Sequence, residues 1–316
     1  IYARSQVNTL FKFNLDGGLI WSKQISGSIT PNNVILTSPE TSLEITPHGN
    51  IIFSQNCTGN YTYDGVTVNS GSGTYAIATL IDTNSNLIRN YAWGMNEGST
   101  IRSRSAIVDA DHNVYMAVNF PSSYTNTFGS STILHLLNGS AFHALLKFDS
   151  QAAPVWAYNI SCANSTNNFF DLSLDNNGNI ALGFSQSGTT SQANIKIAGR
   201  TGGQVALGTL NEGEATFFAA SGSQTSTSNR WGDYSSMNVD PVDDCTFWYT
   251  QEYYSATSSA GWSTRVGSFK YPSCTNAPKG TISGTITLCA TGVPVNLASV
   301  DATGGINRIT GAPGTY

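Results

Sequence analysis

Short apolar segments joined by polar turns recur along the chain. In residues 43–53, 107–116 and 172–182, apolar positions alternate, a turn of Asp, Asn, His or Gly residues follows, and a second apolar run returns. Alternation with a period of two is typical of half-buried strands, and a tight polar turn between two such runs predicts a β-hairpin. Residues 237–249 form a fourth copy of this pattern.

The copies are evenly spaced. The equivalent turn residues Asn50, Asn113, Asn179 and Asp244 lie 63, 66 and 65 residues apart. Further hairpins or weaker copies of them lie between, at residues 10–21, 77–93, 144–156, 215–220 and 265–271. Two hairpins per period make a four-stranded antiparallel unit, and no helical periodicity competes with it.

Such units bury both faces when they stack radially, so the sequence predicts an all-β fold, a β-propeller of four-stranded blades with a period of about 65 residues. A blade usually takes about 40 to 50 residues, so long loops are expected. The segments rich in Gly, Ser and Thr at 60–74, 121–140 and 186–213 suit them. Trp21, Trp93 and Trp156 occupy corresponding places in their blades and are expected to pack between blades.

The predicted domains are a propeller over residues 1–274, a linker over 275–280 and a partial immunoglobulin-like β-sandwich segment over 281–316. Residues 1–3 match the second strand of a blade, and the last blade has three strands. We therefore expect a piece of a longer chain with more blades. In the alternative, a neighbouring subunit supplies the strands missing from the sandwich by edge addition, which would make the protein polymeric.

Composition excludes several classes of protein. Charged residues make up 10% of the chain, against about a quarter in an ordinary soluble protein, and the net charge is -5. The 14 Lys and Arg residues form no cluster, so a nucleic-acid partner is not expected. No apolar run approaches the roughly 18 to 20 residues of a membrane span, so membrane insertion is not expected either.

The cysteines and the sequons indicate export. Five Cys residues without a C-x-x-C pair favour disulfides over zinc. Cys245 lies on the second strand of one blade and Cys274 just past its third strand, so these two are predicted to bond, whereas the pairing of Cys57, Cys162 and Cys289 stays open. Low charge and abundant Ser, Thr and Asn predict a secreted, extracellular protein with glycosylation at Asn56, Asn60, Asn138, Asn159 and Asn164.

Parts of the chain resemble known families. Residues 109–149, with an Asp-His-Asn turn, the Phe-Gly-Ser-Ser-Thr segment at 128–132 and the Ala-Leu-Leu-Lys-Phe-Asp strand, resemble the β-propeller repeats of secreted bacterial proteins (SBBP type), as do residues 63–82. Residues 230–274 are similar to a segment of large exported bacterial proteins. Residues 290–300 resemble the opening strands of carboxypeptidase-regulatory-like domains of immunoglobulin type. The resemblance implies an architecture and a location and brings no catalytic residues.

Two turns have the oxygen density of a calcium loop, at 109–113 and 175–179. Neither has the Glu that closes an EF-hand, and turn formation accounts for every residue, because Asn and Gly adopt positive φ and Asp caps its own turn. We therefore predict no metal and no cofactor. If any loop binds calcium, the acidic segment around Asp233, Asp240, Asp243 and Asp244 is the best candidate.

The predicted function is that of a structural or surface-scaffold protein rather than an enzyme, with adhesion or fibre formation through strand sharing as a further hypothesis. Its expected partners are other copies of itself, cell-surface proteins and glycans. The predicted carbohydrate contacts are Trp231, Tyr234, Trp248, Tyr253 and Trp262. The alternative is a secreted glycan hydrolase of sialidase type, with Asp233 and Glu252 as its carboxylates, or a carbohydrate-binding module.

Overall fold

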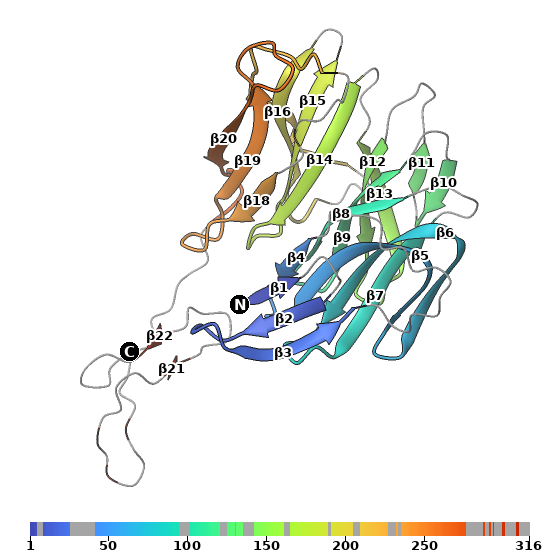
Figure 1. Ribbon diagram of the computed structural model, residues 1–316, viewed down its shortest axis with the longest axis vertical. Helices are drawn as coiled ribbons and strands as arrows, with labels where there is room; N and C mark the ends of the chain where they lie inside the picture. Colours follow the sequence, from blue (N-terminus) through green and yellow to red (C-terminus); the bar gives the residue numbers. More distant parts are fainter. Residues whose placement is uncertain are drawn as a thin grey trace.

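The chain is described as a computed structural model (Figure 1). The residues that the structure describes are 1–4, 9–25, 42–94, 101–120, 125–129, 131–134, 142–160, 165–188, 191–204, 209–226, 232, 235–275, 287, 291, 293, 299–300 and 308–309. Within these ranges every regular element is a β-strand. None of the described residues forms a helix long and apolar enough to span a bilayer. The predicted all-β class is confirmed.

Five antiparallel sheets of three or four strands follow one another along the described chain. The first contains β1 (Tyr2–Arg4), β2 (Thr9–Phe13) and β3 (Leu19–Gln24). The second contains β4 (Leu43–Ile45), β5 (Ile51–Tyr63), β6 (Val66–Ile81) and β7 (Leu87–Gly94). The third contains β8 (Arg102–Val108), β9 (Val114–Phe120), β12 (Phe142–Phe148) and β13 (Pro154–Ile160).

The fourth sheet contains β14 (Ser165–Leu174), β15 (Ile180–Gly188), β16 (Ser191–Arg200) and β17 (Gly213–Phe218). The fifth contains β18 (Ser236–Val239), β19 (Phe247–Tyr254) and β20 (Trp262–Phe269). Two small pairs complete the described strands, β10 (Thr125–Phe128) with β11 (Ser131–Leu134), and β21 (Ser299–Val300) with β22 (Arg308–Ile309). Most of the predicted sandwich segment lies outside the described residues.

Strands within each large sheet lie side by side in chain order. The predicted hairpins at 43–53, 107–116, 172–182 and 237–249 are therefore confirmed. The loop predicted over 60–74 is wrong, because β5 and β6 continue through it and are joined by a two-residue turn. Both turn residues have positive φ, 48° at Asp64 and 76° at Gly65, as a hairpin turn of this length requires.

Successive sheets pack face to face, each pair around an apolar cluster. Leu10 of the first sheet packs with Ile51 and Phe53 of the second. Trp93 is buried between the second and third sheets, and Trp156 between the third and fourth. Trp21 packs against the cluster between the first and second sheets. The three predicted inter-sheet tryptophans are thus confirmed, and burial of their large apolar surfaces stabilises each junction.

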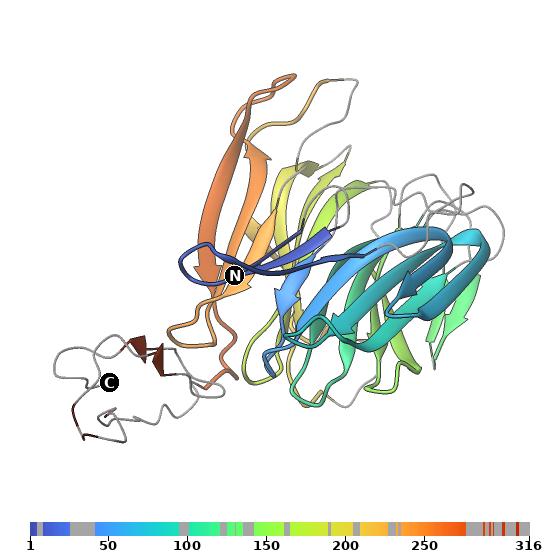
Figure 2. The same ribbon diagram turned by 60° about the horizontal axis from the view of Figure 1, so that its bottom comes forward.

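The fourth and fifth sheets approach very closely at one point. A Cβ atom placed on Gly183 would lie 2.2 Å from the ring of Tyr249, which is fully buried. Only glycine fits under this ring, so the residue type at 183 sets how near the two sheets can come. Figures 1 and 2 show the sheets in sequence from blue through green and yellow to orange.

Candidate functional site

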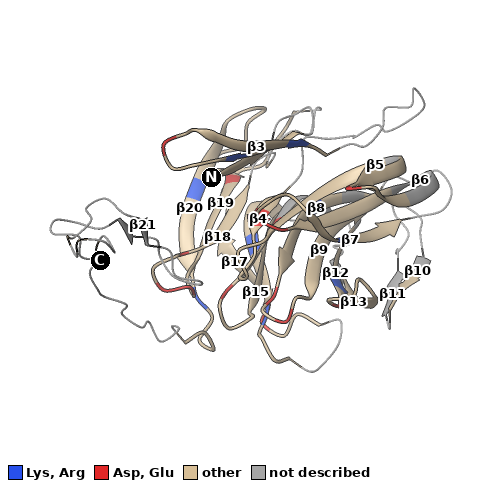
Figure 3. Cartoon of the chain, turned by 90° about the horizontal axis from the view of Figure 1, so that it is seen from below, with Lys and Arg blue, Asp and Glu red and all other residues tan. Residues whose placement is uncertain are grey.

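The first strands of the four later sheets end at one shared cavity. Its volume is about 320 Å³, and its walls come from β4, β8, β14 and β18, from the turns that follow them, and from Ile52 of β5. The lining residues are Glu44, Ile45, Thr46, Pro47, Ile52, Ile107, Val108, Ser173, Leu174, Asp175, Asn176, Val239, Pro241 and Asp244. In the view from below, β4 and β8 lie towards the middle of the molecule and β6 lies at its outside (Figure 3).

Two carboxyl groups lie among these first strands. Burial, and to a lesser degree the negative charge of Asp171, raises the pKa of Glu44 to about 7. Burial raises the pKa of Asp171 to about 6, although the backbone N–H groups of Met237 and Leu172 stabilise its charged form. The sequence patterns considered above were turns and aromatic residues, so they did not single out this pair. The signal that could have found it is an acidic residue inside an apolar strand, as Glu44 is between Leu43 and Ile45.

Side chains on these strands also tie neighbouring sheets together. The Ala106 N–H of β8 donates a hydrogen bond to Ser42 Oγ, 3.0 Å away, just before β4. The Met237 N–H of β18 donates to Asp171 Oδ2 on β14 at 2.7 Å. Both bonds are partly buried, so breaking one leaves a partly shielded polar group without its partner. The polar residues of this region therefore help to fix the order of the sheets.

The carboxyl pair predicts an unusual pH dependence. The pKa of Glu44 in the folded protein, about 7, lies above its ordinary value of 4.5. The stabilisation that this group gives is therefore complete below pH 4 and is lost as the pH rises to about 7. A difference of one unit in pKa corresponds to about 1.4 kcal/mol. Because Glu44 is partly accessible to solvent, we discount this value and expect the wild type to lose about 2 kcal/mol of stability between pH 4 and 8 that Glu44→Gln does not lose.

Urea unfolding at a series of pH values measures this effect. The matched control is Asp16→Asn in the exposed β2–β3 turn, which should leave the pH profile of the wild type unchanged. If the wild type and Glu44→Gln lose stability in parallel between pH 4 and 8, the assignment to Glu44 is wrong.

In the two segments predicted to be turns rather than calcium loops, the Asp carboxylates bond to backbone N–H groups of the same turn. Asp109 Oδ1 accepts the N–H groups of Asp111 and Asn113, at 3.0 and 2.8 Å. Asp175 Oδ1 accepts the N–H groups of two residues of its own turn in the same way. The fourth residue of each turn has positive φ, 65° at His112 and 76° at Gly178. Both segments therefore form the expected turns. Among the described residues, no three His, Cys, Asp or Glu side chains lie together in a way that could hold an ion.

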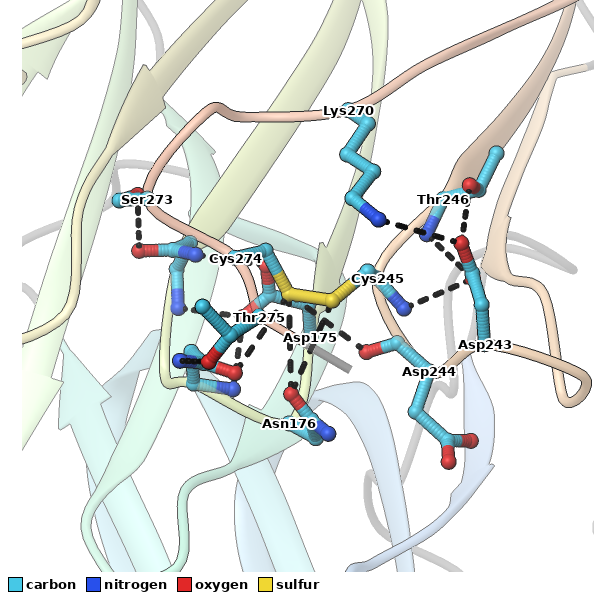
Figure 4. Close-up of a disulfide and its surroundings, with 12 residues drawn as sticks. Asp175, Asn176, Asp243, Asp244, Cys245, Thr246, Lys270, Ser273, Cys274 and Thr275 are labelled. Carbon is cyan, nitrogen blue, oxygen red and sulfur yellow. Dashed lines mark hydrogen bonds and ion pairs between the residues drawn. A yellow bond between two sulfur atoms is a disulfide. The ribbon is translucent and has the colours of Figure 1, made fainter. Parts of the chain in front are cut away.

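The predicted disulfide between Cys245 and Cys274 is present, with an S–S distance of 2.01 Å. It joins the β18–β19 turn to the segment after β20 (Figure 4). The same segment contacts the β14–β15 turn, because Ser273 Oγ donates to Asn179 Oδ1 at 3.3 Å. The bond therefore secures the end of the fifth sheet against the fourth. Cys57 is buried and free, whereas Cys162 and Cys289 lie outside the described residues.

The predicted carbohydrate contacts do not form one platform. Trp231 and Tyr234 lie outside the described residues. Trp248 and Trp262 are 45% and 49% exposed, and the register of β19 with β20 places them on one face of the fifth sheet. Tyr253 belongs to the opposite face, where its ring packs edge-on against Phe218 at 4.6 Å. Tyr253 therefore does not share a face with the two tryptophans, because alternate residues of a strand point to opposite faces.

The candidate carboxylates of a hydrolase are not seen as a pair. Asp233 lies outside the described residues. Glu252 is 9% exposed, and its Oε2 accepts the Gly232 N–H at 2.7 Å. An acid that is buried and occupied in this way has little access to a substrate.

The structure describes the side chains of two of the five sequon asparagines, and these two differ in exposure. Asn60 is exposed at the bulge between β5 and β6. Asn56 is 2% exposed, and its Oδ1 accepts the Ser103 N–H. A glycan at Asn56 is therefore incompatible with the folded protein, since the side chain has no path to solvent. Asn138 and Asn164 lie outside the described residues, as does the side chain of Asn159.

Comparison with known proteins gives no match, either among protein-family models or among curated proteins.

Proposed function

We propose that the chain is an extracellular β-propeller that serves as a structural scaffold at a surface. The observation that carries the proposal is the convergence of β4, β8, β14 and β18 on one cavity. Each of these strands begins its own sheet, and the later strands of that sheet lie progressively further from it. Sheets that share an inner end and pack face to face are the arrangement of propeller blades.

The chemistry of the surface supports an extracellular scaffold. Charged residues are sparse and scattered over the described chain, as Figure 3 shows. A disulfide holds the fifth sheet, and such bonds persist in oxidising compartments. In the repeated turns, the Asp carboxylates accept hydrogen bonds from backbone N–H groups of the same turn, so these carboxylates are already bonded within the turn. These features favour a durable module over an enzyme with an open acid–base site.

The location is tested on intact cells that produce the protein. An antibody against the chain should label their outer surface, and externally added protease should remove that label without lysis. Labelling that requires permeabilised cells would contradict the proposal. The same preparation, screened on glycosidase substrates with Asp233→Ala and Glu252→Ala as variants, tests the hydrolase alternative, which predicts turnover that both changes abolish.

Carbohydrate binding is a second candidate function, favoured by Trp248 and Trp262. Half-exposed indoles on a sheet face flanked by Ser and Thr residues combine stacking surface with hydrogen-bonding groups. We expect a glycan array to show binding that Trp248→Ala and Trp262→Ala each weaken at least about tenfold. The exposed Val242→Ala, in the β18–β19 turn, is the control. Binding that both tryptophan variants retain would contradict this function.

A further inference from the structure

A second cavity lies between the third and fourth sheets and shares only Asn176 with the first. Its volume is about 390 Å³, and its walls come from the β8–β9 and β14–β15 turns, from β9, β12, β15 and β16, and from residues 201–204. Pockets of about 300 to 1,000 Å³ bind small ligands. Most of the lining side chains are polar, so the cavity suits a small polar ligand.

Lys147 of β12 contributes an ammonium group to this cavity. Its Nζ lies over the ring of Tyr115, 5.0 Å from the ring centroid. The Lys147 side chain forms no hydrogen bond or ion pair with the residues that the structure describes. Burial lowers the pKa of Lys147, and the charge of Arg200 acts in the same direction, whereas nearby Asp residues oppose both effects. A half-buried ammonium without a hydrogen-bond acceptor favours an anionic ligand.

The first sheet shows how an equivalent lysine is satisfied. Lys12 and Lys147 are each flanked by a Tyr and a Trp in the same register, which are Tyr2 and Trp21 for Lys12, and Tyr115 and Trp156 for Lys147. Lys12 Nζ donates a hydrogen bond to the Thr83 carbonyl, 2.9 Å away, in the turn after β6 of the next sheet. At the third sheet, the corresponding segment after β16 is residues 201–204, which line the cavity instead. The cavity thus lies where the protein supplies an acceptor in the first repeat.

Arg200 is the second cationic residue of the cavity. Its equivalents at the same register position of the other three later sheets are all apolar, namely Ile81, Phe148 and Phe269. The guanidinium lies over the ring of Trp156, 5.0 Å from the ring centroid. It donates to the carbonyl oxygens of Gln204 and Thr209, at 2.5 and 2.7 Å. These contacts fix the guanidinium at the cavity wall, where its positive charge adds to that of Lys147.

The two acidic residues of the cavity differ in what they can still bind. The Asp109 carboxylate accepts hydrogen bonds from Asp111, Asn113 and the Tyr115 hydroxyl. Asp111 is exposed, and its carboxylate accepts no hydrogen bond from the described part of the chain. A ligand that carries both a carboxylate and hydroxyl groups would match the two cations and Asp111 together. A phosphate ion would bring two negative charges near Asp111 and be repelled by it.

We propose that the cavity between the third and fourth sheets binds an acidic sugar of the uronic acid class. Its carboxylate would lie against Lys147 and Arg200, and a ring hydroxyl would donate to Asp111. A uronic acid combines one carboxylate with several hydroxyl groups on one compact ring, and a cavity near the lower end of the ligand-binding range suits a single ring. Such a site goes beyond the proposed scaffold function and includes neither Trp248 nor Trp262.

Isothermal titration calorimetry of the purified chain tests this site, with glucuronic and galacturonic acid as ligands and with glucose, galactose and inorganic phosphate as comparisons. At least one uronic acid should bind. Its neutral counterpart and phosphate should each bind at least about tenfold more weakly, because neither offers both a carboxylate and hydroxyl groups.

Lys147→Met keeps an unbranched side chain over Tyr115 but removes the charge, so it should weaken binding of the uronic acid at least about tenfold. Lys12→Met is the matched control. It changes the equivalent lysine of the first sheet, which already bonds to Thr83, and should leave binding unchanged.

Reductive methylation of the wild type gives the same test if Lys147→Met fails to fold. The uronic acid should slow methylation of Lys147, measured by mass spectrometry of peptides, and leave the rate at Lys12 unchanged. The proposal is overturned if neither uronic acid binds, or if phosphate or the neutral sugar binds equally well. It is also overturned if binding neither weakens in Lys147→Met nor protects Lys147 from methylation.

Discussion

Phe247→Ala is expected to lower the free energy of unfolding by about 3 to 5 kcal/mol, the usual cost of truncating a fully buried aromatic side chain. Phe247 has no exposed surface, stacks on Phe269 at a ring distance of 5.3 Å and meets Tyr271 edge-on at 5.6 Å. The change removes the centre of the cluster between the fourth and fifth sheets. Equilibrium unfolding in guanidinium chloride measures the loss.

The next residue along the strand is the matched control. Trp248 points to the opposite face and is 45% exposed. Trp248→Ala should cost clearly less than Phe247→Ala, about 1 kcal/mol in a dilute sample, because nearly half of the side chain already lies in water and its hydrogen bond to Asp240 is exposed. Equal losses in the two variants would show that the described face assignment of β19 is incorrect.

Removal of the Cys245–Cys274 disulfide is expected to cost about 3 to 4 kcal/mol. The two residues are 29 positions apart, and cross-linking a loop of that length restricts the unfolded chain by about this amount. In the folded protein the bond also holds the segment that contacts Asn179. The double variant Cys245→Ser/Cys274→Ser should therefore unfold at a clearly lower denaturant concentration, and reduction of the wild type should give the same midpoint.

Ser273→Ala provides the comparison within the same segment. It removes one hydrogen bond, that to Asn179, and keeps the disulfide. Its cost should stay near 1 kcal/mol, the typical net value of a hydrogen bond. An unchanged midpoint in the double cysteine variant would mean that the fifth sheet is held by packing alone.

The sequence predicted the strands and turns well because their signals are local. Alternating apolar residues marked β14 and β15, and the Asp and Asn residues between them marked the turn that the structure shows. The loop predicted over residues 60–74 failed for a related reason. Runs of Gly, Ser and Thr suggest a loop by composition, yet the positive φ values at Asp64 and Gly65 close a long hairpin there.

The candidate site was harder to find from sequence. Glu44 and Asp171 lie in different sheets, and only the packing of those sheets buries Glu44 and brings the charge of Asp171 near it, the two causes that raise the pKa of Glu44. Cys245 and Cys274 could be paired because they belong to one repeat. Tyr253 was grouped with Trp248 by proximity along the chain, although the two side chains lie on opposite faces of β19.

By itself, then, the sequence determined the all-β class, the hairpin register and the disulfide, because strand alternation, turn formation and a short loop closure depend on neighbouring residues. Only the tertiary structure decided which faces are covered. Three features follow from how the sheets stack: Asn56 is buried, Glu252 accepts a hydrogen bond from Gly232, and Trp248 is exposed. Such stacking depends on contacts between residues far apart in the chain. The repeat predicts where each sheet begins, but only the packed sheets show which residues contact one another.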